Sequence, residues 1–351
     1  MEQWGASSIG AFFTRSAEWA ISLKGPTVVL LTDGRTFVAG LIDPEPLVVR
    51  PGHIWSEVIF TPTDGVPIAV DGIPNSRAQE MLVQVGRERN KQLAIVEFRH
   101  KCKRFDTLIE PIVQWWRGMT NEIETYKSAH WWLPQELVDR WQTDRSKVLQ
   151  DNAELTRLLG DAEVMKYVQT KGHEVKSALE WRVKDIPSYI AALNEEHLKC
   201  ELIDCTHFLD NVEKSPLTKE QARSVICFDN RVMTVAAAGS GKTSTMVAKA
   251  GYALYRRITT ADKILMLAFN GKAAKELQHR ADERLKKIGI EPGTIKAQTF
   301  HAFGFGVIGR ATGKKPSLAS WVEKKKELEK LAELIDGLKD RDEHLDPVGP
   351  F

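Results

Sequence analysis

Cysteine is scarce in this chain, and long apolar runs are missing. The 351 residues include four cysteines, Cys102, Cys200, Cys205 and Cys227, too few for a disulfide scaffold in a chain of this length. No apolar run approaches the ~20 residues of a membrane span, and no cleavage-site pattern follows the N-terminal residues. These absences exclude the disulfide-rich secreted and membrane-spanning classes, and they predict a cytoplasmic protein with no membrane contact.

An excess of either charge is also missing. The chain has 49 Lys and Arg residues against 47 Asp and Glu residues, a formal net charge of +2. A domain that binds nucleic acid through overall positive charge is therefore excluded, and any such affinity must come from a local basic track. With 42% hydrophobic residues, the composition excludes a disordered chain and allows two or three folded domains.

Three regions differ in pattern along the chain. Residues 1–90 combine β-branched runs with Asp-Gly turns, which predicts a small β-rich domain. Residues 91–214 have few glycines and apolar residues at helical spacing, which predicts a helical region with a break or kink at Pro111. Residues 215–351 alternate apolar strands with amphipathic helices, the pattern of an α/β domain with a parallel sheet.

The expected elements follow from these patterns. In the first region we expect hairpins over 27–42 and 54–70 and then a helix over 76–88. The second region is expected to end in one or two helices within 181–212. In the third we expect strands over 231–236, 263–269 and 294–299 and helices over 243–255, 272–288, 301–309 and 321–342.

The most informative stretch is V-M-T-V-A-A-A-G-S-G-K-T at residues 232–243. Its small residues allow successive backbone N–H groups to curl around a phosphate at the positive end of the following helix; they are Ala236, Ala237, Ala238, Gly239, Ser240 and Gly241. Lys242 is expected to reach the β- and γ-phosphates and Thr243 to ligate Mg²⁺. Ala236 replaces the first glycine of the usual pattern, and a plain Gly/Ser turn before a helix is the alternative.

Two other groups of residues have ordinary explanations beside functional ones. His197, Cys200, Cys205 and His207 could hold a metal, but such sites usually take ligands from two separate elements, which favours half-buried thiols and surface histidines. The pairs Trp115-Trp116 and Trp131-Trp132 lie near basic residues and could stack on bases. Packing is the commoner role for tryptophan, and we prefer it here.

The order of four motifs adds a family resemblance. They read L-T-K-E-Q-A at 217–222, A-A-A-G-S-G-K-T at 236–243, L-A-F-N-G-K-A-A-K-E-L at 267–277 and Q-T-F-H-A-F at 298–303. In this order they resemble the amino-terminal half of UvrD/Rep-type superfamily 1 DNA helicases, and within that group the helicase IV branch. The resemblance implies a P-loop NTPase fold of the RecA-like type, here with an incomplete parallel sheet, preceded by the β-rich domain and the helical region.

The resemblance also implies site residues, cofactors and a partner. Gln221 would read the adenine edge of ATP, while the loop residues 236–243 would hold the triphosphate with Mg²⁺ on Thr243. Single-stranded or partially duplex DNA would be contacted by two segments, Phe269, Asn270 and Lys272 in one and Thr299, Phe300 and His301 in the other. Read without the family, Phe269 and Phe300 would be core aromatics.

The sequence departs from the family pattern in ways that limit the expected activity. Ser244 stands where many members have arginine, and Gly271 where many have asparagine. The family's next motif is an Asp-Glu pair at a strand end, which binds Mg²⁺ and activates water; here Asp282-Glu283 and Asp342-Glu343 follow no apolar strand.

We therefore expect the amino-terminal portion of an ATP-dependent DNA helicase, a fragment or short product that binds ATP but does not hydrolyse it efficiently by itself. The alternative is a non-motor regulatory or adaptor protein in which residues 1–214 dock a protein partner.

Overall fold

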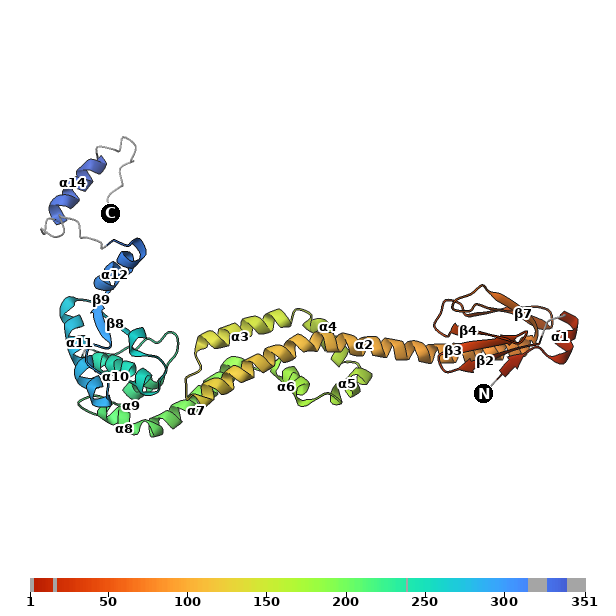
Figure 1. The fold of residues 1–351 in the computed structure, drawn as a ribbon, viewed down its shortest axis with the longest axis horizontal. Coiled ribbons are helices and arrows are strands. Elements are labelled where there is room, and N and C mark those ends of the chain that lie inside the picture. The colour runs from red at the N-terminus through yellow and green to blue at the C-terminus, as the bar shows by residue number, and fades with distance from the viewer. Residues whose placement is uncertain (1–2, 15–17, 238, 315–326, 340–351) are drawn as a thin grey trace. The chain divides into compact units, whose positions relative to one another are not determined.

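A computed structural model describes residues 3–14, 18–237, 239–314 and 327–339 of the chain (Figure 1). The chain divides into two compact units, one formed by residues 1–122 and 139–185 and the other by residues 123–138 and 186–351. No helix in the described ranges combines the length and apolar character needed to cross a bilayer.

Two antiparallel sheets and a short helix, α1 (Ser8–Thr14), form the N-terminal part of the first unit. One sheet has the order β1-β2-β3-β4 and the other β5-β6-β7; the strands are β1 (Gln3–Gly5), β2 (Trp19–Lys24), β3 (Thr27–Thr32), β4 (Arg35–Gly40), β5 (Leu47–Pro51), β6 (Trp55–Phe60) and β7 (Ile68–Pro74). Both predicted hairpins are confirmed. The β3–β4 turn uses Asp33 and Gly34 at φ 47° and 69°, the left-handed geometry that Asp-Gly favours.

A 54-residue helix, α2 (Asn75–Ser128), follows directly. The helix predicted over 76–88 is its first part, and α2 continues through residue 90 and past Pro111 without ending. Of the break or kink expected at Pro111, the break is therefore wrong; the proline is exposed, and neighbouring hydrogen bonds and packing outweigh one lost backbone bond. Four shorter helices follow, and apart from residues 135–138 they belong to the first unit: α3 (Gln135–Val148), α4 (Asn152–Leu159), α5 (Ala162–Gln169) and α6 (His173–Trp181).

The second unit contains the motif-bearing helices and a parallel pair of strands. Its helices are α7 (Ile186–Asp204), α8 (Thr206–Asn211), α9 (Lys219–Ile226), α10 (Lys242–Tyr255), α11 (Gly271–Leu285), α12 (Phe300–Thr312) and α14 (Glu327–Lys339), with short 3-10 turns η1 (Ala261–Lys263) and η2 (Lys286–Ile288). Strands β8 (Leu265–Ala268) and β9 (Lys296–Thr299) pair in parallel. The predicted helix over 321–342 is confirmed for 327–339, and its remaining residues lie outside the described ranges.

One predicted strand is wrong. Residues 231–236 form no strand, so the parallel sheet of the described residues has two strands instead of three. The run is apolar, but Met233 is 87% exposed and Val235 84% exposed. The preference of such residues for strands depends on packing against neighbours, and the described part of the chain provides no neighbouring strand here.

Two clusters of buried side chains stabilise this unit. One joins α7 and α8 to α9 and α10 through Leu198, Phe208, Val225 and Tyr252. The other joins α10, α11, β8 and the residue before β9 through Val247, Leu277, Met266 and Ile295. Helix α10, which follows the phosphate-loop sequence, therefore contributes buried side chains to both clusters.

Candidate nucleotide and DNA site

The loop before α10 adopts the backbone geometry that its glycines predict. Gly239 and Gly241 have φ of 79° and 84°, left-handed values that other residues rarely adopt. The backbone N–H and the hydroxyl of Ser240 donate to the Ala237 carbonyl at 3.3 and 2.6 Å. Gly241 is the N-cap of α10 and Lys242 its first residue. Ala238 lies outside the described residues.

Lys242 and Thr243 occupy the first turn of α10, as the motif predicts. The Lys242 ammonium donates to the carbonyls of Ala236 and Ala237 at 2.8 and 2.7 Å, so its charge lies over the loop that precedes it. Thr243 is half-buried beside it. The glycine geometry and the helix N-terminus at this end fit a bound phosphate, because a helix N-terminus attracts anions. The loop and helix thus have the features of an anion site, although residues 231–236 before them form no strand.

Gln221 lies against this loop although 15 residues separate it from Ala236 in the sequence. It belongs to a capping box at the start of α9, in which its Oε1 accepts from the Thr218 N–H at 3.0 Å. Its Nε2 donates to the Ser240 carbonyl at 2.9 Å. A Cβ added to Gly241 would come within 2.5 Å of Nε2. The positive φ therefore favours glycine at 241, and a larger residue there would also displace the Gln221 amide from its present position.

The two predicted DNA segments lie side by side. Ala268, the last residue of β8, pairs in register with Thr299, the last residue of β9, so both segments begin at the same edge of the parallel pair. Phe269 is 87% exposed and Phe300 58% exposed, while Lys272 and His301 are exposed as well. The core-aromatic explanation of these rings is therefore wrong, and both rings offer a face to a ligand.

Asn270 and Thr299 also have a structural role that the motifs do not indicate. Asn270 Oδ1 accepts from the Ala273 N–H at 2.9 Å and caps α11. Thr299 Oγ1 accepts from the Ala302 N–H at 3.1 Å and caps α12. Both residue types are favoured at this position because they satisfy an N–H group that has no partner within the helix.

Arg280 connects α11 to the phosphate-loop helix. Its guanidinium donates to the Ser244 hydroxyl at 3.1 Å, next to Thr243, and forms an ion pair with Glu276 at 3.3 Å. Sequence reasoning missed this residue, because an arginine within a charged helix resembles a solvent-exposed one. Helix α11 begins at the predicted DNA segment after β8, so this one helix contacts both predicted parts of the site.

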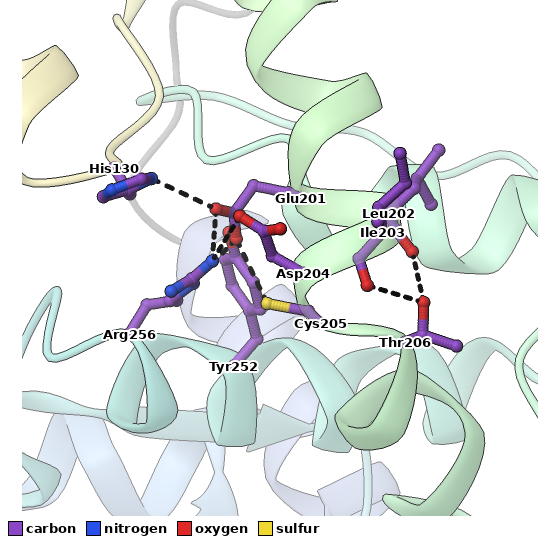
Figure 2. Close-up of polar contacts among 9 residues, drawn as sticks. All are labelled: His130, Glu201, Leu202, Ile203, Asp204, Cys205, Thr206, Tyr252 and Arg256. Atoms are coloured by element: carbon purple, nitrogen blue, oxygen red, sulfur yellow. Dashed lines mark hydrogen bonds and ion pairs between the residues drawn. The ribbon is translucent and has the colours of Figure 1, made fainter.

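A second feature that the sequence did not reveal is a buried polar cluster around Glu201 (Figure 2). Glu201 is 0% exposed. Its carboxylate accepts from Tyr252 Oη at 2.7 Å, from Arg256 Nε at 2.8 Å and from the Cys205 thiol at 3.2 Å. Burial raises the pKa of Cys205 to about 12. Since Tyr252 and Arg256 belong to α10 and its C-cap, the cluster fastens α7 to the far end of the phosphate-loop helix.

The cluster does not have the character of a metal site. His130, Glu201 and Asp204 offer three ligand atoms close together. However, the Arg256 guanidinium already pairs with the Glu201 carboxylate, and its Nη2 lies 3.9 Å from Asp204 Oδ2. Of the four residues weighed from sequence, Cys205 is buried in this cluster, His197 is half-buried, and Cys200 and His207 are exposed. This dispersal argues against a shared metal ion, but of the details expected from the sequence only the surface position of His207 is confirmed: one thiol is buried, the other is exposed, and His197 is half-buried.

The tryptophan pairs are engaged in packing. Trp115 is buried, and its Nε1 donates to the Trp141 carbonyl at 3.0 Å. Trp131 contacts the Tyr126 ring edge-on, and Trp132 contacts His197 in the same way. These contacts support a packing role for the indoles that make them.

Comparison with known proteins agrees with the motifs. Residues 217–348 match the UvrD/REP helicase N-terminal domain, and residues 1–170 match the DNA helicase IV / RNA helicase N terminal family. DNA helicase IV of Escherichia coli (strain K12) is 39% identical over 134 residues, which cover 38% of this chain and 19% of that protein.

Matches to other relatives are shorter. An ATP-dependent helicase/nuclease protein of Staphylococcus haemolyticus is 35% identical over 74 residues, and its counterpart in Staphylococcus saprophyticus is 32% identical over the same length; each match covers 21% of this chain and 6% of the relative. The chain thus spans about a fifth, or less, of the length of these curated relatives. Residues 217–348 are thus similar to the UvrD/REP helicase N-terminal domain, and residues 1–170 to the N-terminal region of the helicase IV family.

Proposed function

We propose that this chain is the ATP-binding portion of a DNA helicase, whose full-length parent couples ATP hydrolysis to translocation along single-stranded DNA and to unwinding. The observation that carries the proposal is the register pair Ala268–Thr299. It brings two segments distant in sequence to one sheet edge, each with an exposed aromatic ring.

Three residues would bind different parts of the nucleotide and its Mg²⁺. Lys242 would turn its ammonium from the loop carbonyls to the β- and γ-phosphates, and its charge would offset theirs. The Thr243 hydroxyl would ligate Mg²⁺, which neutralises phosphate charge when bound. Gln221 would meet the adenine edge, because a carboxamide offers a donor and an acceptor together.

DNA would be held at the edge formed by the ends of β8 and β9. Phe269 and Phe300 would stack on bases, and Lys272 would contact a phosphate. Arg280 gives the two ligands a physical connection, since it joins α11 to Ser244 beside the phosphate loop. A movement of α11 on DNA binding would then be transmitted to the nucleotide site, as a motor requires.

We further propose that the 351-residue chain binds ATP without hydrolysing it efficiently. Strand β8 is followed by Phe269 and β9 by Phe300, and neither position has a carboxylate. Asp282 lies within α11, where its Oδ1 accepts from Gln278 and from the Gly293 N–H at 3.0 and 2.7 Å. Glu283 pairs with Arg284. Asp342 and Glu343 lie outside the described residues.

The test measures binding of a non-hydrolysable ATP analogue, binding of single-stranded DNA and ATP turnover in the same samples. We expect Lys242→Ala to lose analogue binding and Lys287→Ala, an exposed lysine after α11, to keep it, with negligible turnover in all samples. Equal analogue binding by Lys242→Ala and the unchanged chain would contradict the phosphate-loop assignment. Strong DNA-stimulated turnover by the unchanged chain would contradict the second proposal.

A regulatory or adaptor role is the second candidate. Helix α1 exposes Ile9, Phe12 and Phe13, with Phe12 79% and Phe13 67% exposed, and exposed apolar groups of this kind mark interaction surfaces. A protein partner could dock there. Analogue binding without any DNA binding at low salt would favour this role over the motor.

A further inference from the structure

Lys249 is a lysine of α10 that neither the motifs nor the proposed chemistry uses. It lies half-buried two turns after Lys242. Its ammonium donates to the Ser224 carbonyl at 2.9 Å and to the Cys227 carbonyl. The same nitrogen lies 4.8 Å from the centre of the Phe228 ring. A lysine that leaves water in this way must have partners that compensate the loss of hydration.

The partners of Lys249 belong to the end of α9. Ser224 lies in the last turn of that helix and Cys227 is its C-cap. Carbonyls at this end have no partner within the helix, and the helix dipole makes them attractive to a cation. Burial lowers the pKa of Lys249, but the carbonyls and the ring face offset part of the cost of holding the charge. The bond therefore joins α10 to the C-terminal end of α9.

Helix α9 is consequently fastened at both ends. At its start, Gln221 Nε2 donates to the Ser240 carbonyl of the phosphate loop. At its end, Lys249 holds Ser224 and Cys227. Between them, Ala222, Val225 and Ile226 are buried in the apolar cluster shared with α10. Apolar contacts keep α9 on α10 but tolerate small sliding movements, whereas hydrogen bonds at two ends define its position along the surface.

We propose that Lys249 is a positioning residue for nucleobase selectivity: it fixes α9 so that the Gln221 amide meets adenine and rejects guanine. This inference rests on the proposed function, because it deepens the role of Gln221 in ATP binding. It adds a residue that contacts neither base nor phosphate.

The selectivity for adenine over guanine follows from the hydrogen bonds that the Gln221 amide can still form. Oε1 uses one acceptor position for the Thr218 N–H, and Nε2 uses one of its two hydrogens for Ser240. One acceptor position and one N–H remain. Adenine presents a donor at N6 and an acceptor at N7, which match these two groups. Guanine presents acceptors at both O6 and N7, so its O6 would face Oε1, and the mismatch costs binding only while the amide is held in place.

The experiment compares the affinities of non-hydrolysable ATP and GTP analogues by calorimetry, for the 351-residue chain and for Lys249→Met and Lys249→Gln. Methionine removes the charge and both hydrogen bonds at similar volume, while glutamine keeps one N–H donor group. We expect the ATP-to-GTP affinity ratio to fall by about fivefold or more in Lys249→Met, the lower range of ordinary coupling between sites, and by a smaller factor in Lys249→Gln.

Tyr252→Phe is the matched control. Tyr252 lies in the same helix and is buried in the apolar cluster that α10 shares with α9, and its hydroxyl binds Glu201 rather than α9. Tyr252→Phe should lower the melting temperature and leave the ATP-to-GTP affinity ratio unchanged. This control separates a general loss of stability from a displacement of α9.

An unchanged ratio in a folded Lys249→Met chain would refute the proposal; if that variant does not fold, an unchanged ratio in Lys249→Gln refutes it. An original chain that binds both analogues equally would contradict the adenine contact of Gln221, and the role of Lys249 would fall with it. An original chain that prefers ATP, with variants that prefer it equally, would leave the proposed function intact and reject only this inference.

Discussion

Glu201 shows at the scale of one residue how a buried charge can stabilise this fold. It has no exposed surface, and three side chains donate to its carboxylate. Removing its charge in Glu201→Gln leaves the Arg256 guanidinium with only the more distant carboxylate of Asp204, at 3.9 Å, which we expect to lower the free energy of unfolding by about 3 kcal/mol. Glu195→Gln is the control, because its ion pair with Arg223 is exposed and should contribute less than about 1 kcal/mol. Urea unfolding of both variants measures the difference.

The same residue gives the stability a dependence on pH. Burial pushes the pKa of Glu201 up, but hydrogen bonds from Arg256, Tyr252 and Cys205 hold it below its ordinary value of 4.5. Because the folded-state pKa is the lower one, the stabilisation is full above pH 4.5 and is lost as the pH falls through the folded-state value. Glu201→Gln should reduce this acid sensitivity as the pH falls below 4.5, whereas equal sensitivity in both chains would contradict the assignment.

Residues of this kind differ from the motif residues in how far the sequence predicts them. Gly241 and Lys242 were predicted because their roles depend on neighbours within one loop. Glu201, Lys249 and Arg280 have partners 55, 25 and 36 positions away. Charged residues within helices are usually solvated, so nothing local distinguishes these three. Only the packing of α7, α9 and α11 around α10 shows their partners.

At the scale of single elements, the start of α11 has two explanations that a pair of variants can separate. Asn270 caps the helix, and the motif predicts that it also contacts DNA. Asn270→Ala should lose about 1 kcal/mol of stability with the cap. Asn270→Asp should keep the cap, since aspartate is an equally good N-cap, but should weaken single-stranded DNA binding through repulsion of the phosphates. DNA binding that is equal in Asn270→Asp and the original chain would leave only the structural role.

Helices and strands were predicted well where the apolar residues of the segment itself recur with the period of that element. The helices at 242–255 and 271–285 and the strands at 265–268 and 296–299 were found within a few residues. The strand expected at 231–236 failed for a non-local reason, because it needs neighbours that the described residues do not provide. The length of α2 was missed for a related reason. Its charged, weakly patterned middle gains helical order from α3 to α6, as in the bond from Arg104 to Glu154 at 2.6 Å.

At the scale of the whole molecule, the near balance of charge decides how DNA binding must respond to salt. With a net charge of +2, the surface as a whole attracts DNA weakly, and binding at the sheet edge would neutralise only a few phosphates. Each phosphate contact to a single strand adds about 0.7 to the slope of log affinity against log salt. We expect a slope of about −2 for the chain. Lys272→Ala should make it shallower by about 0.7.

The affinity is measured by fluorescence anisotropy with a single-stranded oligonucleotide, and two variants serve as controls. Phe269→Ala should lose about 1–3 kcal/mol of affinity at every salt concentration and keep the slope, because stacking releases no counterions. Lys287→Ala should change neither quantity, since α11 separates it from Asn270 by 15 residues, about 22 Å of helix. If Lys272→Ala and Lys287→Ala had equal effects, the attraction would be spread over the surface, and the sheet edge would not be the DNA site.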